Sequence, residues 1–159
     1  MAKNDGMIDG ARLRQMAIEA KEHIAKEKAE EKCIKEEQRL RNKDPEYQKN
    51  LFTEILVKRL TDATASYSRI GKLEYDVINY EYDITRSVIS KMGEVIKNDS
   101  YLGRDTYHQW TVEIIKEWAV VRNISVEFYT YTGTHRDGGF LGRYGPEYTY
   151  QTASVKFSW

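Results

Sequence analysis

The stretch from Gly133 to Pro146 holds the residues best suited to chemistry. His135 and Asp137 could form an acid–base pair, and Arg136 and Arg143 could bind an anion through their guanidinium groups. Five of the ten glycines fall in this stretch, and glycine lets a backbone approach a ligand closely. We therefore expect residues 133–146 to form a long loop between two strands, and such loops are often binding elements.

Two interpretations of this loop stay open. The glycine spacing matches no phosphate-loop or dinucleotide motif, so the loop could be a hairpin tip whose glycines only satisfy turn geometry. It could instead bind a protein partner or a phosphate-bearing ligand. The binding residues would then be the polar and aromatic residues of the loop and the tyrosines of the flanking strands, namely His135, Arg136, Asp137, Phe140, Arg143, Tyr144, Tyr129, Tyr131, Tyr148 and Tyr150.

Other titratable residues give no pattern of a catalytic or metal site. Glu74 and Glu81 are seven residues apart, about 10 Å along a helix, which suits two ion pairs better than a shared proton. Asp105-x-x-His108 comes nearest to a bundle metal motif, but Asp105 suits a helix cap and His108 a packed, hydrogen-bonded position. Cys33 has no base beside it. We expect no catalytic residue, no metal and no cofactor.

Composition narrows the class of protein. Lys plus Arg and Asp plus Glu both total 25, so a basic surface for nucleic acid is not expected. The single cysteine favours a reducing compartment, and no run of the sequence has the length and apolarity of a signal peptide or membrane span. We expect a soluble cytoplasmic protein that does not enter a membrane. The tyrosine-rich, Lys- and Glu-rich composition is typical of viral or phage accessory proteins, which would place it in the host cytoplasm or the virion.

Residues 1–44 are expected to form a charged helical arm. The helix would run from Met7 to Asn42, supported by Glu–Lys pairs four residues apart such as Glu31 and Lys35. It could be a solvated helix or a coiled-coil helix that binds a partner, although fewer than three clean heptads are present. Asp44 and Pro45 suit the N-cap and first position of the next helix, so the arm ends there.

Residues 45–159 are expected to form an α+β core domain, with helices over 45–122 and a β-hairpin over 123–159. Leu73–Ile96 carries two apolar rows at helical spacing and is predicted to be a central helix packed on two sides. A single bent helix over 45–97 is the alternative, because one glycine costs only about 1 kcal/mol. Trp110 and Trp118 mark a further core helix. After residue 123 apolar residues alternate, which predicts two antiparallel strands whose exposed face carries the four tyrosines.

The function that fits best is non-enzymatic: an adaptor, an inhibitor or a structural component of a complex. Tyrosine and arginine are enriched at protein interfaces, and the arm or the hairpin edge could join copies into a homo-oligomer. The alternative is a small phosphate-ligand-binding protein or enzyme that uses the 133–146 loop. Nucleic-acid binding through stacked tyrosines would need a basic groove.

Overall fold

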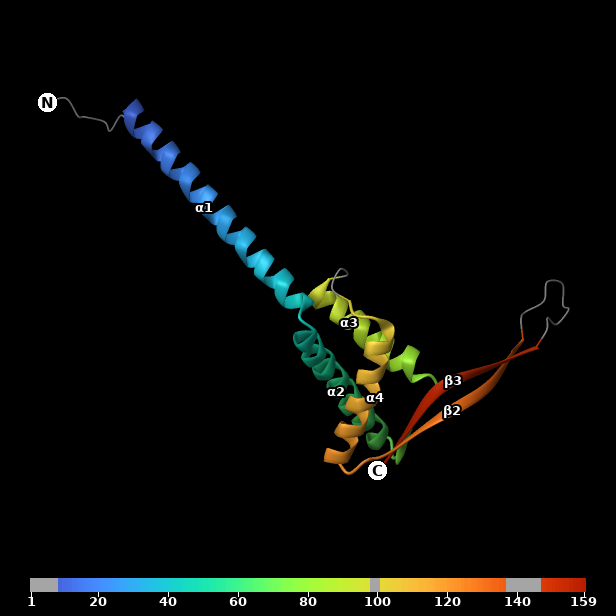
Figure 1. Ribbon diagram of the computed structural model, residues 1–159. Helices are drawn as coiled ribbons and strands as arrows, with labels where there is room; N and C mark the ends of the chain where they lie inside the picture. Colours follow the sequence, from blue (N-terminus) through green and yellow to red (C-terminus); the bar gives the residue numbers. More distant parts are fainter. Residues whose placement is uncertain (1–8, 98–100, 137–146) are drawn as a thin grey trace. The chain divides into compact units, whose positions relative to one another are not determined.

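The computed structural model describes residues 9–97, 101–136 and 147–159 (Figure 1). The chain divides into two compact units, Met1–Asn42 and Lys43–Trp159. The described residues form helices and a small antiparallel sheet, so the expected α+β class is confirmed. None of the described helices combines the length and the apolar character needed to cross a membrane.

From Gly10 onward the first unit is helical, and its helix, α1 (Gly10–Lys43), ends at the first residue of the second unit; no residue of α1 is buried. The Asp9 carboxylate accepts a hydrogen bond from the Ala11 amide and begins the helix. Its apolar side chains, including Leu13 and Ile34, remain about half exposed. Ion pairs four residues apart, such as Glu31 with Lys35, support the helix in place of packing.

The second unit begins with α2 (Pro45–Arg69), which starts as its sequence predicts. The Asp44 carboxylate accepts a hydrogen bond from the Glu46 amide at 3.1 Å, and Pro45 occupies the first turn. Phe52, Leu56 and Leu60 lie one turn apart and are buried. The helix ends before Gly71, whose φ of +78° is a backbone conformation that favours glycine.

The predicted central helix over Leu73–Ile96 is wrong in its first third, and so is the single bent helix over 45–97. A short strand, β1 (Glu74–Val77), comes first, followed by a π-helical segment, η1 (Glu81–Arg86), and then α3 (Ser87–Ile96). Tyr75 and Val77 alternate with charged residues and pair with a distant strand, which residue spacing within the segment cannot reveal.

Burial along this segment follows one of the two predicted apolar rows. Five of the row's seven members are buried, namely Val77, Tyr80, Ile84, Val88 and Met92. The other two, Leu73 and Val95, are exposed. Of the second row, which consists of Ile78, Tyr82, Ile89 and Ile96, only two residues contribute to the core. Ile78 and Tyr82 stay exposed, whereas Ile96 is buried and Ile89 packs against the core. The segment therefore packs mainly on one side.

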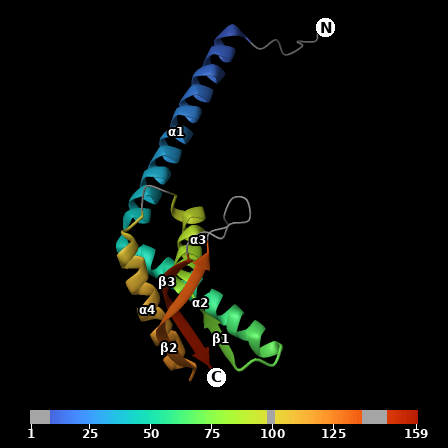
Figure 2. The same ribbon diagram turned by 90° about the vertical axis from the view of Figure 1, so that its right-hand side faces the viewer.

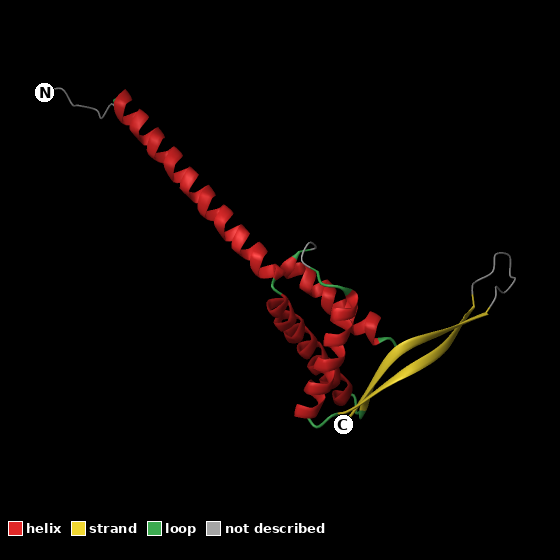
Figure 3. Ribbon diagram, viewed as in Figure 1, coloured by secondary structure: helices red, strands yellow, loops and turns green. Residues whose placement is uncertain are grey.

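The sheet contains β1, β2 (Ser125–Arg136) and β3 (Glu147–Ser158) in the order β1-β3-β2, with both pairs antiparallel. The hairpin β2–β3 is confirmed, whereas the third strand was not predicted. Val126 and Phe128 of β2 share a face with Val155 and Phe157 of β3, and these side chains belong to or pack against the hydrophobic core. Figure 3 shows the strands in yellow beside the red helices. Figure 1 shows the far half of the hairpin extending beyond the helices of this unit, and Figure 2 views the hairpin along its length.

The last helix, α4 (Arg104–Val121), supplies the aromatic part of the core. Trp118 meets the Phe157 ring edge-on at 5.9 Å, and Tyr107 stacks on Phe52 at 5.6 Å. The buried Tyr107 hydroxyl donates to Gln48 Oε1 at 3.0 Å and accepts from the Leu102 amide at 3.1 Å. These contacts join α2, α4 and the segment before α4.

Candidate functional site

The two long strands of the hairpin pair without interruption. Their register runs from Ser125 opposite Ser158 to Arg136 opposite Glu147, with one residue facing one residue throughout. Residues 133–136, predicted to begin the loop, are therefore strand residues, and this prediction is wrong. The alternation of side chains between the two faces continues through Thr130, Thr132 and Thr134. The strand does not end at Gly133, because a glycine can occupy a strand position.

The remaining predicted loop residues, Asp137, Phe140, Arg143 and Tyr144, lie outside the described residues. The phosphate-binding alternative, which uses two of them, stays a prediction. The part that is described places His135 and Arg136 on opposite faces of β2, because successive strand residues point to opposite sides. Arg136 also forms an ion pair with Glu147 at 3.3 Å, so a carboxylate already neutralises its charge.

The four predicted tyrosines lie on one face of the hairpin, opposite the face that packs on the helices. Residues directly opposite in an antiparallel pair share a face, which places Tyr129 and Tyr131 of β2 with Tyr148 and Tyr150 of β3. Tyr148 and Tyr150 are 51% and 44% exposed. Tyr129 and Tyr131, predicted to be exposed, are half-buried. We call these four residues the tyrosine face.

One end of the tyrosine face is tied to β1. The Tyr129 hydroxyl donates to the Asp76 carboxylate at 2.6 Å. This hydrogen bond, assisted by burial, raises the pKa of Tyr129 to about 12. Tyr129 therefore has a structural role, whereas Tyr148 and Tyr150 keep large areas of ring open to a partner.

Gly133 lets the Tyr150 ring lie close against the backbone of β2. A Cβ atom at Gly133 would clash with Cζ of the Tyr150 ring, and the glycine itself is buried. The ring thus covers the bare backbone of the strand beside it. Aromatic rings placed across a glycine in this way are a known device for stiffening a sheet edge.

The outer edge of β2 is open. In the order β1-β3-β2 this strand lies at the edge of the sheet, and no described strand pairs with its outer side over Ser125–Arg136. An unpaired edge presents a row of backbone donors and acceptors that can join another strand. The hairpin therefore offers two adjoining surfaces, the edge of β2 and the tyrosine face.

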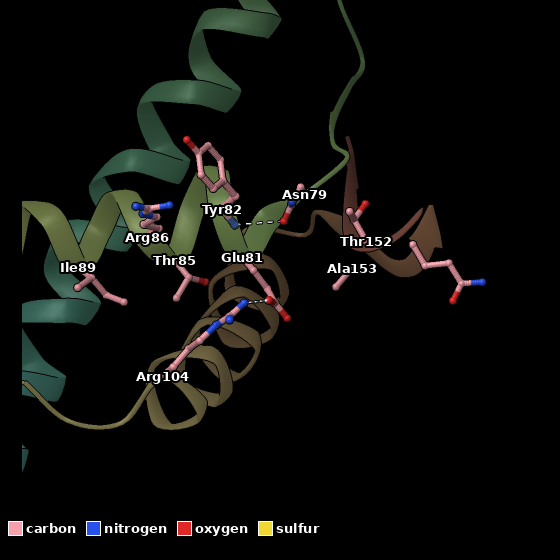
Figure 4. Close-up of a pocket in the computed structure, with 10 residues that line it drawn as sticks. Asn79, Glu81, Tyr82, Thr85, Arg86, Ile89, Arg104, Thr152 and Ala153 are labelled. Carbon is pink, nitrogen blue, oxygen red and sulfur yellow. Dashed lines mark hydrogen bonds and ion pairs between the residues drawn. The ribbon is translucent and has the colours of Figure 1, made fainter. Parts of the chain in front are cut away.

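A second candidate is a pocket of about 590 Å³ between η1, α4 and β3 (Figure 4). Arg104 reaches Glu81 across it, with an Nη2–Oε2 distance of 2.8 Å. Glu81 Oε1 also lies 3.4 Å from His108 Nδ1, and His108 Nε2 lies 3.3 Å from the Tyr80 hydroxyl. Tyr82, Arg86 and Thr152 are among the other residues that line the pocket.

The charged groups of the pocket are only partly paired. Glu81 forms an ion pair with Arg104, which fits its expected role, and Glu74 likewise pairs with Lys156 at 2.7 Å. The Arg86 guanidinium, which also lines the pocket, lies over the Tyr82 ring at 5.2 Å. Among the described residues no three His, Cys, Asp or Glu side chains come close enough to hold a metal ion. Residue spacing did not predict this pocket. Its only signals were Glu81 and the Asp105-x-x-His108 spacing, and these come together only in the fold.

The hairpin is the better candidate, because no described strand pairs with the outer edge of β2 and the rings of Tyr148 and Tyr150 are about half exposed. Comparison of the chain with protein-family models, with curated proteins and with solved structures found no match in any of the three.

Proposed function

We propose that this protein is a non-enzymatic assembly protein that joins copies of itself through the far half of its hairpin. The observation that carries the proposal is the open edge of β2, which continues for 12 residues beside an exposed tyrosine face. Two-stranded hairpins are only marginally stable in water, so one that extends beyond the core is a costly feature unless a partner covers it.

The chemistry of the surface supports binding to protein. Tyrosine supplies a large ring at low cost in side-chain entropy and is enriched at interface hot spots. The far half of β2 also carries threonines at 130, 132 and 134, which favour extended backbone. In the pocket, by contrast, the Arg104 side chain is already paired with Glu81, which leaves less of its charge available for a substrate.

The test is the mass of the full chain in solution, measured by light scattering after size exclusion over a range of concentrations. We expect an oligomer, and we expect Thr132→Lys with Thr134→Lys to shift it to the monomer. Two lysines on an edge strand repel a second strand that brings the same charges. Circular dichroism checks that the variant keeps its fold.

A matched control carries the same change in net charge on α1. Gln15→Lys with Gln38→Lys adds two positive charges to an exposed helix and should leave the mass unchanged. If these changes dissociate the oligomer and the hairpin changes do not, the arm is the interface and the proposal is wrong. A wild-type chain that is monomeric at every concentration also contradicts it.

A further inference from the structure

The geometry of β2 points to the way in which two copies would meet. Resting on the proposed function, we infer that β2 pairs antiparallel with β2 of a second copy, with Tyr131 opposite Tyr131 of that copy. The result is one continuous sheet in the order β1-β3-β2-β2-β3-β1. The two copies are related by a two-fold axis that passes between the two Tyr131 residues.

β2 lacks most of the features that keep edge strands apart. Proteins protect such strands with charged side chains, above all lysine, and with proline, bulges or short length. β2 has no lysine, proline or bulge over its 12 residues, and its charged residues Glu127 and Arg136 lie toward its two ends. The opposite edge of the sheet is different. β1 has only four residues, two of which are Glu74 and Asp76. Beyond β1, the hydroxyls of Thr152 and Ser154 donate to the Ile78 carbonyl, which partly occupies that side of β3.

Glu127 and His135 favour antiparallel pairing of β2 with β2 of a second copy. Glu127 lies near one end of the strand and His135 near the other, and both are exposed. With Tyr131 at the centre, Glu127 of each copy lies directly opposite His135 of the other. A shift of two residues in either direction separates this pair. At this spacing the Glu127 carboxylate can accept a hydrogen bond from the His135 imidazole, and such cross-strand pairs stabilise a register.

The remaining side chains fit the same register. A two-fold axis perpendicular to the sheet keeps the tyrosine faces of both copies on one side. On the other side Thr130 lies opposite Thr132, and Phe128 lies opposite Thr134, in each direction. Thr–Thr pairs and pairs of an aromatic with a β-branched residue are both favourable across strands. Tyr129 lies opposite Gly133, over which the Tyr150 ring of that same copy is packed, so these two rings would meet at that position.

A single cysteine on the two-fold axis tests this arrangement. Tyr131→Cys is introduced in a Cys33→Ala background, so that each chain has one thiol. Directly opposite residues of antiparallel strands have Cβ atoms about 4.5–5.5 Å apart, close to the spacing that a disulfide needs. The matched control is Tyr148→Cys in the same background. It lies on the same face but on β3, one strand away from the axis.

The readout is the rate at which a mild oxidant converts each variant to a covalent dimer, followed on a non-reducing gel. We expect Tyr131→Cys to form the dimer and Tyr148→Cys to do so roughly tenfold more slowly or not at all. Light scattering of the reduced Tyr131→Cys variant shows whether it still assembles. An assembled variant that does not cross-link, or a faster reaction at residue 148, overturns the inference.

The cross-linking experiment and the lysine experiment can fail independently. If the lysine changes at 132 and 134 dissociate the oligomer but Tyr131→Cys does not cross-link, the hairpin remains the interface and only the edge-to-edge pairing is wrong. If the lysine changes have no effect, the hairpin is not the interface and both fail.

Discussion

Replacing Tyr107 with phenylalanine tests how the core of the second unit is held together. The change removes only the hydroxyl, because the ring keeps its place against Phe52 and Trp110. The lost hydroxyl donates to Gln48 Oε1 and accepts from the Leu102 amide. Gln48 is fully buried, so water cannot replace the hydrogen bond at that end.

The expected cost follows from these two contacts. A buried polar group that loses its partner costs about 1–3 kcal/mol, and a half-buried amide costs less. We therefore expect the free energy of unfolding to fall by about 2 kcal/mol. With a typical urea dependence of about 2 kcal/mol per molar, the midpoint should move by about 1 M.

The assay is urea unfolding followed by tryptophan fluorescence. All three tryptophans lie in the second unit, so the signal reports that unit alone. Tyr82→Phe, which alters an exposed ring, is the control. Adding Gln48→Leu to Tyr107→Phe should cost less than the sum of the two single changes, because both partners are then apolar. A loss below about 0.5 kcal/mol for Tyr107→Phe, or strict additivity, would refute this account of the buried hydrogen bonds.

Three further outcomes are expected. Leu56→Ala, at a fully buried position, should lower the free energy of unfolding by about 2–5 kcal/mol in the same urea assay. The pKa of Tyr129 is raised to about 12, so its hydrogen bond to Asp76 stabilises the fold below about pH 10 and loses this effect as the pH rises toward 12. Asp76→Asn should therefore lower the pH at which the Tyr129 hydroxyl titrates. The measurement is tyrosinate absorbance, with Tyr129→Phe as the reference that lacks this hydroxyl. Gly133→Val should push the Tyr150 ring outward and increase its nitration, measured by mass spectrometry, and unchanged nitration would contradict the packing of that ring on the strand.

Local signals in the sequence were enough to predict the elements whose chemistry is local. Asp44 and Pro45 begin α2 because a cap and a proline act on the nearest turn of the backbone. The alternation around Val126 and Val155 predicted the hairpin, because both strands need one apolar face. The same alternation placed the four tyrosines together on the other face.

The errors occurred where a distant segment decides the structure. Leu73 and Val77 are four residues apart, which suits a helix, but Tyr75 and Val77 equally suit a strand. Pairing with Phe157 and Val155 decides between them, and Leu73 is left 70% exposed. The pocket near Arg104 likewise depends on which segments meet, so no spacing within one segment could predict it. An exposed hairpin edge was expected, but β2 forms that edge only because β1 pairs with β3.

The position of β3 between β1 and β2 has a consequence for how the protein is made. Synthesis proceeds from the N-terminus, so both outer strands leave the ribosome before the strand that separates them. Until β3 emerges, Val77 and Phe128 have no strand beside them, and the sheet cannot close from either side. Such non-local pairing is slow to form and exposes apolar strands meanwhile. A chain whose synthesis pauses before Val155 would therefore present two unpaired strands to its neighbours on the polysome.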